Sequence, residues 1–126
     1  KETDINSIFE EKCDIISPCA LGGVINSKTK KKLKCKAIVG AANNQLDNQE
    51  TALWLKENNI FYAPDYLVNS GGVIAISCEI NNSEDTLEDQ LNKISDKVLL
   101  LLKESKKSSL STDKIVEDLA WKRINT

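Results

Sequence analysis

The 126-residue sequence contains no histidine and no methionine, and its four cysteines show no C-x-x-C spacing. The missing histidine excludes a histidine-containing zinc site and removes the commonest general base. Because a four-cysteine zinc site normally needs paired spacing, we expect no bound metal. No signal peptide is recognised, so reduced thiols and a cytoplasmic location are the default expectation. The lack of any methionine suggests a piece of a longer or processed chain.

Charge and hydrophobic patterning exclude two further classes of partner. Apolar residues make up 40% and charged residues 29%, with a net charge of −2, an ordinary globular balance that does not favour nucleic acid or acidic membranes. The local exception, "KTKKKLKCK" over residues 28–36, has no interleaved aromatics and is interpreted as a solvated short helix rather than a nucleic-acid patch. The longest apolar run, Val98–Leu102, is too short to span a membrane.

Apolar runs alternate with helical patterns in the first half of the chain. The runs predict strands over residues 13–20, 35–42 and 60–65, the first stopped by Pro18. A short helix that Ser27 could cap follows the first strand. A second helix covers 47–59, with Asp47 and Glu50 at capping-box spacing and a stop at Asn58–Asn59. This alternation predicts an α/β fold with a parallel sheet and crossover helices.

The ends of the chain are predicted to be helical. Residues 5–11 suggest the end of a helix. Ser83 could cap a later helix with Glu84 and Asp85 in its first turn. That helix has an apolar stripe of Leu87, Leu91, Ile94, Val98 and Leu101. A last helix presents Ile115, Val116, Leu119 and Ile124.

Polar and glycine-rich residues follow each predicted strand. Asn43 and Asn44 stand at the end of the second strand, between "SPCALGG" and "PDYLVNSGG" at the other two ends. Ligands of parallel sheets bind outside the carboxyl ends of the strands. An unpaired buried amide costs about 1–3 kcal/mol, so these asparagines should face a crevice, a ligand or each other. Equally, they could serve only as caps of loops and helices.

Three segments resemble, in order and spacing, the C-terminal part of the amino-acid dehydrogenase family, which comprises leucine, valine, phenylalanine and glutamate dehydrogenases. The segments are "CDIISPCALGGVIN", "KCKAIVGAANNQL" and "YAPDYLVNSGGVIAISCE". The resemblance is closest to the leucine, valine and phenylalanine branch. It implies the second half of a Rossmann-type parallel sheet over residues 1–80, followed by C-terminal helices over 81–126.

The resemblance also implies an activity. Family members oxidatively deaminate an L-amino acid to its 2-oxo acid and ammonia, with hydride transfer to NAD. Their catalytic lysines and aspartate, and the phosphate-binding GxGxxG, match nothing in this sequence. No catalytic residue is therefore assigned here, and the isolated chain is expected to be inactive.

Several positions carry over from the family. Ala20 and Leu21 match the loop against the nicotinamide-side ribose, although Pro and Gly alone would explain a plain turn there. Asn43 matches the asparagine at the nicotinamide and substrate, where an amide can donate and accept without adding charge. Asn44 and Gln45 are expected to brace the loop.

Substrate contacts carry over in the same way. Asn69 matches the mouth of the cleft, and Val73 and Ile76 match positions that line the substrate's side-chain pocket. If a helix starts near Asn69, all three share one face with Ile80. Glutamate dehydrogenases have a carboxylate-binding serine where Ile76 stands, which favours an apolar amino acid here. The sequence alone favours a different interpretation, in which Val73 and Ile76 are ordinary core residues.

Three hypotheses remain at this stage. The chain is part of an NAD-dependent dehydrogenase of apolar amino acids, a non-catalytic remnant or split subunit that acts through a partner chain, or an unrelated α/β module that binds a small ligand. In the first two cases we expect a homo-oligomer or association with the missing half, because an unpaired parallel strand edge is a template for another strand.

Overall fold

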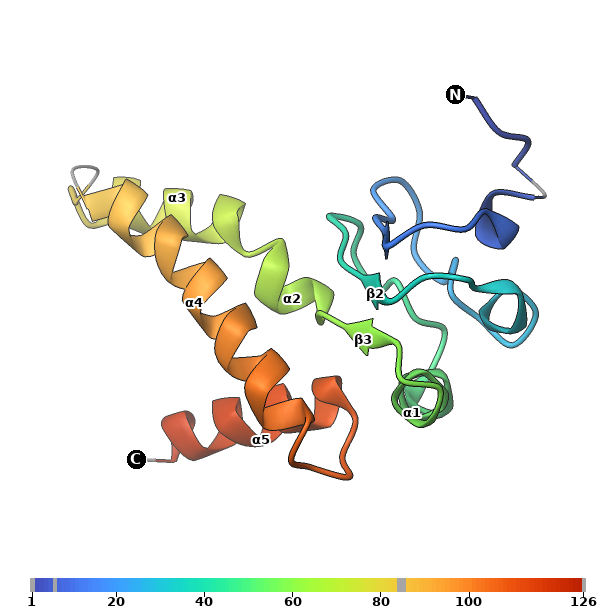
Figure 1. Cartoon of the computed structure of the whole chain (residues 1–126). Coiled ribbons are helices and arrows are strands. Elements are labelled where there is room, and N and C mark those ends of the chain that lie inside the picture. The colour runs from blue at the N-terminus through green and yellow to red at the C-terminus, as the bar shows by residue number, and fades with distance from the viewer. Residues whose placement is uncertain (1, 6, 84–85, 126) are drawn as a thin grey trace.

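The computed structural model describes residues 2–5, 7–83 and 86–125 and shows a small sheet beside a set of longer helices (Figure 1). In chain order the elements are the 3₁₀ helix η1 (Ile8–Glu10), β1 (Ile15–Ile16), the 3₁₀ helix η2 (Lys30–Lys32), β2 (Ala37–Ile38), α1 (Gln49–Glu57), β3 (Phe61–Tyr62), α2 (Asp65–Val68), α3 (Gly71–Ile80), α4 (Leu87–Ser105) and α5 (Thr112–Ile124).

The sheet confirms the predicted α/β class. Its three strands are parallel and lie in the order β1-β2-β3, with Ile15 opposite Ala37 and Ala37 opposite Phe61. Each strand is only two residues long, shorter than predicted. The apolar runs therefore also include extended backbone that leaves the ladder, such as the loops after Ile16 and Ile38. Sequence hydrophobicity does not distinguish that backbone from paired strand.

The hydrophobic core lies between the sheet and α1. Ile25, Ile38 and Leu55 are fully buried, and Cys35, Ile60 and Tyr62 complete the cluster.

Near the amino terminus the expected helix is a single 3₁₀ turn, because only Phe9 of that segment packs against the core while Ile5 and Ile8 are exposed.

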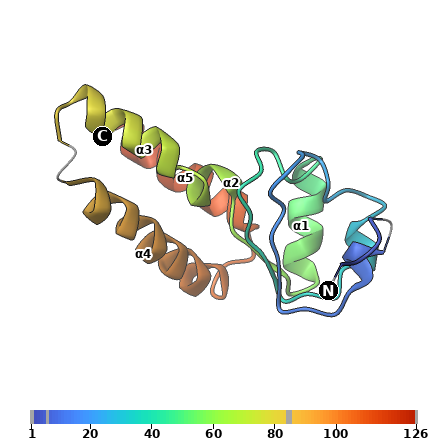
Figure 2. The ribbon, with the colours of Figure 1, turned by 90° about the horizontal axis from the view of Figure 1, so that it is seen from above.

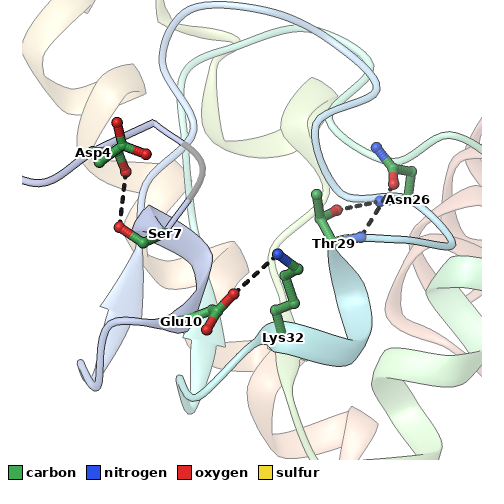
Figure 3. A network of polar contacts seen from close by, with 6 residues as sticks. All are labelled: Asp4, Ser7, Glu10, Asn26, Thr29 and Lys32. Carbon is green, nitrogen blue, oxygen red and sulfur yellow. Dashed lines mark hydrogen bonds and ion pairs between the residues drawn. The ribbon is translucent and has the colours of Figure 1, made fainter.

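The residues predicted to cap the two helices are both incorrect. Asn48, not Asp47, caps α1, because its extended backbone lets the side chain accept from Thr51 N at 2.9 Å. Asn26, not Ser27, organises the turn before η2, because its Oδ1 accepts from the backbone of Lys28 and Thr29. Figure 3 shows the contacts between Asn26 and Thr29. The predicted stop of α1 is confirmed by Asn59, which adopts a left-handed φ of 57°.

Helices α3 and α4 pack as a hairpin that extends from the sheet on the side away from α1 (Figures 1 and 2). The apolar stripe predicted for α4 is only partly covered by the rest of the protein. Leu101 is buried and Leu91 is exposed, and the other three members, Leu87, Ile94 and Val98, are half-buried. As described, α4 begins at Leu87; the expected first turn with Glu84 and Asp85 lies outside the described residues.

Helix α5 packs against α1, β3 and α4. Ile115 and Val116 are half-buried, but Leu119 and Ile124 are exposed, so only part of its predicted apolar face is covered. None of the described helices is long and apolar enough to cross a membrane.

Candidate functional site

The loops that follow the three strands meet at one edge of the sheet. Ala42 N donates to Pro18 O at 2.9 Å, and Gly23 N donates to Asn44 O at 2.7 Å, which joins the loops after β1 and β2. Asn44 N donates to Asp65 Oδ2 at 2.8 Å, which joins the loop after β2 to the start of α2. The polar residues that are scattered along the sequence are therefore neighbours in space, as the parallel sheet predicts.

Two glycines allow this close approach. A Cβ built on Gly40 would lie 2.2 Å from Pro18 O, and one built on Gly22 would lie 2.8 Å from Asn43 O. Both distances are far below normal contact, so the loops touch backbone to backbone. The first loop therefore lies directly against the peptide of Asn43.

Asn44 and Gln45 hold the loop after β2 from within. Asn44 adopts a left-handed φ of 52°, which asparagine tolerates better than most residues. Gln45 is fully buried, and its Nε2 donates to Gly40 O at 2.7 Å and to Ala42 O at 2.9 Å. These contacts agree with the bracing role expected from the sequence. The buried Gln45 Oε1 accepts no hydrogen bond from the described residues.

Asn43 points the other way, towards solvent and towards Asn69. Asn69 Nδ2 donates to Asn43 Oδ1 at 2.6 Å and lies 3.4 Å from Ala41 O. Asn43 is exposed, and within the described ranges its own amide nitrogen donates to no protein group. The side chain is therefore fixed on its acceptor side and free on its donor side.

The remaining positions predicted for the site lie on the surface around this pair. Ala20 and Leu21 are exposed on the turn that leads to Gly22.

Val73 and Ile76 are 72% and 59% exposed on α3 and share a face with Ile80 at 73%. The interpretation of Val73 and Ile76 as core residues is therefore wrong, because α3 buries Cys78 and half-buries Ile74 instead. Asn69 ends α2 and precedes α3, so it does not belong to the α3 face as expected.

Sequence reasoning missed Asp65, which is buried at the centre of these contacts. Its Oδ1 accepts from Tyr62 OH at 2.9 Å while its Oδ2 accepts from Asn44 N. Burial and then the hydrogen bond to Asp65 raise the pKa of Tyr62 well above its usual range. The available signal was "PD" directly after a strand, where an acidic residue begins a helix.

A cysteine also stands at this edge. The Cys19 Sγ lies 3.4 Å from Ser17 Oγ, and this contact, followed by a backbone hydrogen bond from Ala41, lowers the pKa of the thiol. No group of three or more metal-ligating side chains occurs among the residues the structure describes.

A cavity of about 420 Å³ lies elsewhere, between α1, β3 and the end of α4. It is bridged by Lys56 Nζ, which donates to Ser105 O, and Asn43 and Asn69 are not among its lining residues.

The parallel sheet defines an α/β protein, and in such sheets ligands bind outside the carboxyl ends of the strands. Comparison with known proteins gives the family. The chain belongs to the Glutamate/Leucine/Phenylalanine/Valine dehydrogenase family, whose pattern matches residues 1–117. This confirms the resemblance seen in the sequence at the level of the family.

Individual relatives agree with this assignment. The chain is 39% identical over 122 residues to phenylalanine dehydrogenase of Thermoactinomyces intermedius, covering 96% of this chain and 33% of the relative. It is 38% identical over 128 residues to leucine dehydrogenase of Geobacillus stearothermophilus, covering 100% and 35%. The crystal structure of L-tryptophan dehydrogenase from Nostoc punctiforme superposes with a TM-score of 0.91 at 36% identity, covering 98% and 37%. The chain thus spans about a third of the length of these relatives.

Proposed function

We propose that this chain is the C-terminal part of an NAD-dependent dehydrogenase of apolar L-amino acids. In this proposal residues 1–80 form the second half of a Rossmann-type nucleotide-binding domain and residues 81–126 form the C-terminal helices. The whole protein converts an amino acid of the leucine, valine or phenylalanine type to its 2-oxo acid and ammonia. The single observation that supports this best is the Asn69–Asn43 pair at the sheet edge, with the Asn43 donor left available.

The residues present fit the nicotinamide end of NAD, which would accept a hydride from the substrate α-carbon when bound. Asn43 can donate its free amide hydrogens to a carboxamide oxygen without adding charge. Asn69 keeps the Asn43 oxygen occupied and so fixes which end of the amide faces the ligand. Ala20 and Leu21 lie exposed beside it, and Gly22 lets their backbone approach because it has no side chain.

The apolar face of α3 supports the proposed choice of substrate. Val73 and Ile76 present hydrocarbon to solvent and no charged or hydrogen-bonding group. A carboxylate placed on that face would lose hydration without gaining a partner, whereas an aliphatic or aromatic side chain would bury apolar area on both sides. The groups that move protons during the reaction are assigned to the remainder of the protein.

Steady-state kinetics on the whole protein test this proposal. We expect NADH formation with leucine, valine or phenylalanine, little with glutamate, and none when the 126-residue chain is assayed by itself. Asn43→Ala should reduce the activity strongly. Asn81→Ala should not, because the Asn81 amide donates only within the end of α3 to Ser77. Preference for glutamate would overturn the proposed substrate, and an inactive whole protein would favour the non-catalytic remnant or split subunit.

One observation favours association with a partner. β1 is an edge strand of the sheet, and its Ile15 is 59% exposed. An edge of this kind can pair with another strand. We therefore propose that β1 is covered in the working protein, either by the remaining half of the nucleotide domain or by a second copy of the chain.

A further inference from the structure

The segments around β1 and β2 run side by side in one constant register. Four contacts between them join residue n to residue n + 22: Glu10–Lys32 at 2.9 Å, Asp14–Lys36 at 2.7 Å, Ile15 opposite Ala37, and Ile16 opposite Ile38. Figure 3 shows the first of these pairs between η1 and η2. The same sequence offset therefore recurs from the 3₁₀ helices to the sheet.

Cys13 and Cys35 stand at the same offset, between the Glu10–Lys32 and Asp14–Lys36 pairs. Cys35 is buried in the core cluster, and the half-buried Cys13 packs against that cluster. Both thiols are free, and both line one cavity of about 310 Å³. Burial, followed by the nearby Cys13, raises the pKa of Cys35.

The register of the ladder supports a bond between them. Cys13 and Cys35 each lie two residues before the Ile15–Ala37 pair, so they would be opposite each other if that register continued beyond the strands. Adjacent strands lie about 4.8 Å apart, which is inside the usual range of about 4.4–6.8 Å between the Cα atoms of disulfide-bonded cysteines. Cys19 and Cys78 lie in other places: Cys19 on the strand-end loop, and Cys78 on α3 beside Gln90.

We propose that Cys13 and Cys35 form a reversible redox couple, oxidised to an intrachain disulfide by a small anionic disulfide of the glutathione class. This inference does not depend on the proposed dehydrogenase function.

The chemistry balances in two exchange steps. The more accessible Cys13 attacks as thiolate and breaks the S–S bond of the reagent, which forms a mixed disulfide and releases one reagent thiolate. Cys35 then loses its proton and attacks the Cys13 sulfur, which closes the protein disulfide and releases the second reagent thiolate. The protein dithiol loses two electrons and two protons, and the reagent disulfide is reduced to two thiols.

The charge of the cavity suits such a reagent. Besides the two thiols its lining residues are Lys12, Lys34, Lys36 and Asp14. Asp14 is paired with Lys36, which leaves a positive balance from Lys12 and Lys34. An anionic disulfide should therefore concentrate at Cys13, and a cationic one such as cystamine should react more slowly.

Peptide mapping of the full-length protein tests the proposal. After incubation with glutathione disulfide and alkylation of the remaining thiols, we expect a peptide pair joined through Cys13 and Cys35, lighter by two hydrogen atoms. Cys19 should carry glutathione instead, since no second thiol stands opposite it. Dithiothreitol should restore alkylation of both paired thiols, and the oxidised protein should melt at a higher temperature.

Two matched variants sharpen the result. Cys13→Ser should leave Cys35 reduced under the same treatment, whereas Cys78→Ser should leave the cross-link unchanged. Wild-type mapping alone remains decisive if Cys13→Ser fails to fold. A stable glutathione adduct on Cys13 with Cys35 still alkylated, or a bond from Cys13 to Cys19, would overturn the proposal.

Discussion

Asn69 donates a 2.6 Å hydrogen bond to the side-chain oxygen of Asn43, and this bond connects the end of α2 to the loop after β2. The two asparagines are 26 residues apart in the sequence and share no secondary-structure element. Orientation of the Asn43 amide is thus determined by a residue outside its own loop.

We predict that Asn69→Ala lowers kcat/KM of the whole protein about fivefold, because a hydrogen bond of this kind contributes about 1 kcal/mol and positions Asn43. The variant Asn81→Ala serves as control. Like Asn69, the native Asn81 donates a short hydrogen bond through Nδ2, in this case a 2.7 Å bond to Ser77 O, but Asn81 lies at the far end of α3. In the double variant Asn43→Ala/Asn69→Ala the second substitution should add little. Fully multiplicative losses would show that the two residues act independently.

Gln45→Ala should destabilise the protein by about 2–3 kcal/mol, because the carbonyls of Gly40 and Ala42 would lose their buried donor. Urea unfolding followed by circular dichroism measures the change. Gln49→Ala, at the exposed first position of α1, is the comparison and should shift stability by less than about 0.5 kcal/mol. Equal effects of the two substitutions would contradict the bracing role of Gln45.

The two tyrosines should make the protein sensitive to alkali. Burial, then Asp113 and Glu117, raises the pKa of Tyr66 to about 12, and the pKa of Tyr62 is raised further. The folded state therefore binds more protons than the unfolded state once the pH exceeds about 10, the usual tyrosine value. Stability should be unaffected by these groups below that pH and should fall as the pH rises from about 10 towards 12.

Phenolate absorbance checks this directly. The signal should stay low through pH 10 in the native protein and rise with unfolding, and Tyr62→Phe should weaken the alkaline loss. In Tyr66→Phe, where Tyr62 is the remaining tyrosine, phenolate that forms near pH 10 without unfolding would contradict the buried Tyr62–Asp65 contact.

Along the exposed face of α3, Val73→Ala and Ile76→Ala should raise KM for an apolar amino acid roughly tenfold, since each removes hydrocarbon from the proposed pocket. Neither should change the free energy of unfolding by more than about 1 kcal/mol, because both side chains are exposed. Ile80→Ala, one turn farther along the same face, should leave KM unchanged. Parallel kinetics and urea unfolding separate the two effects, and a large loss of stability without a change in KM would count against the pocket.

The 126-residue chain by itself is expected to self-associate, because β1 leaves one side of a parallel sheet unpaired. Sedimentation velocity at increasing concentration should show a growing fraction of larger species. A charge on the edge, Ile15→Lys, should reduce this association, while Leu21→Lys on the exposed turn should not. A sharp monomer with cooperative unfolding at all concentrations would refute the expectation.

Local signals in the sequence were sufficient for part of this structure. Alternation of apolar runs and helical periods predicted the parallel sheet, and Asn43 and Asn44 after the second strand marked the edge at which the strand-end loops meet. The surroundings of α3 could not be predicted, because Val73, Ile74 and Ile76 are all apolar and only the packing against α4 decides which of them is covered. Asp65 was missed for a similar reason. Its partners, Tyr62 and Asn44, come together only after the strand ends converge.

Contact between the strand-end backbones also determines how freely the chain can vary. In a saturation library, positions 22 and 40 should accept almost nothing but glycine, since any larger residue must displace a neighbouring carbonyl. Position 72 should tolerate many residues, because within the described residues an added Cβ there would meet no atom within 4 Å apart from its chain neighbours and the backbone of its own helix. Gly22 and Gly72 each belong to a Gly-Gly pair in the sequence, yet they should differ sharply in the substitutions that they tolerate. Related proteins with another residue at position 40 should mainly be ones in which the loops after β1 and β2 no longer pack against each other.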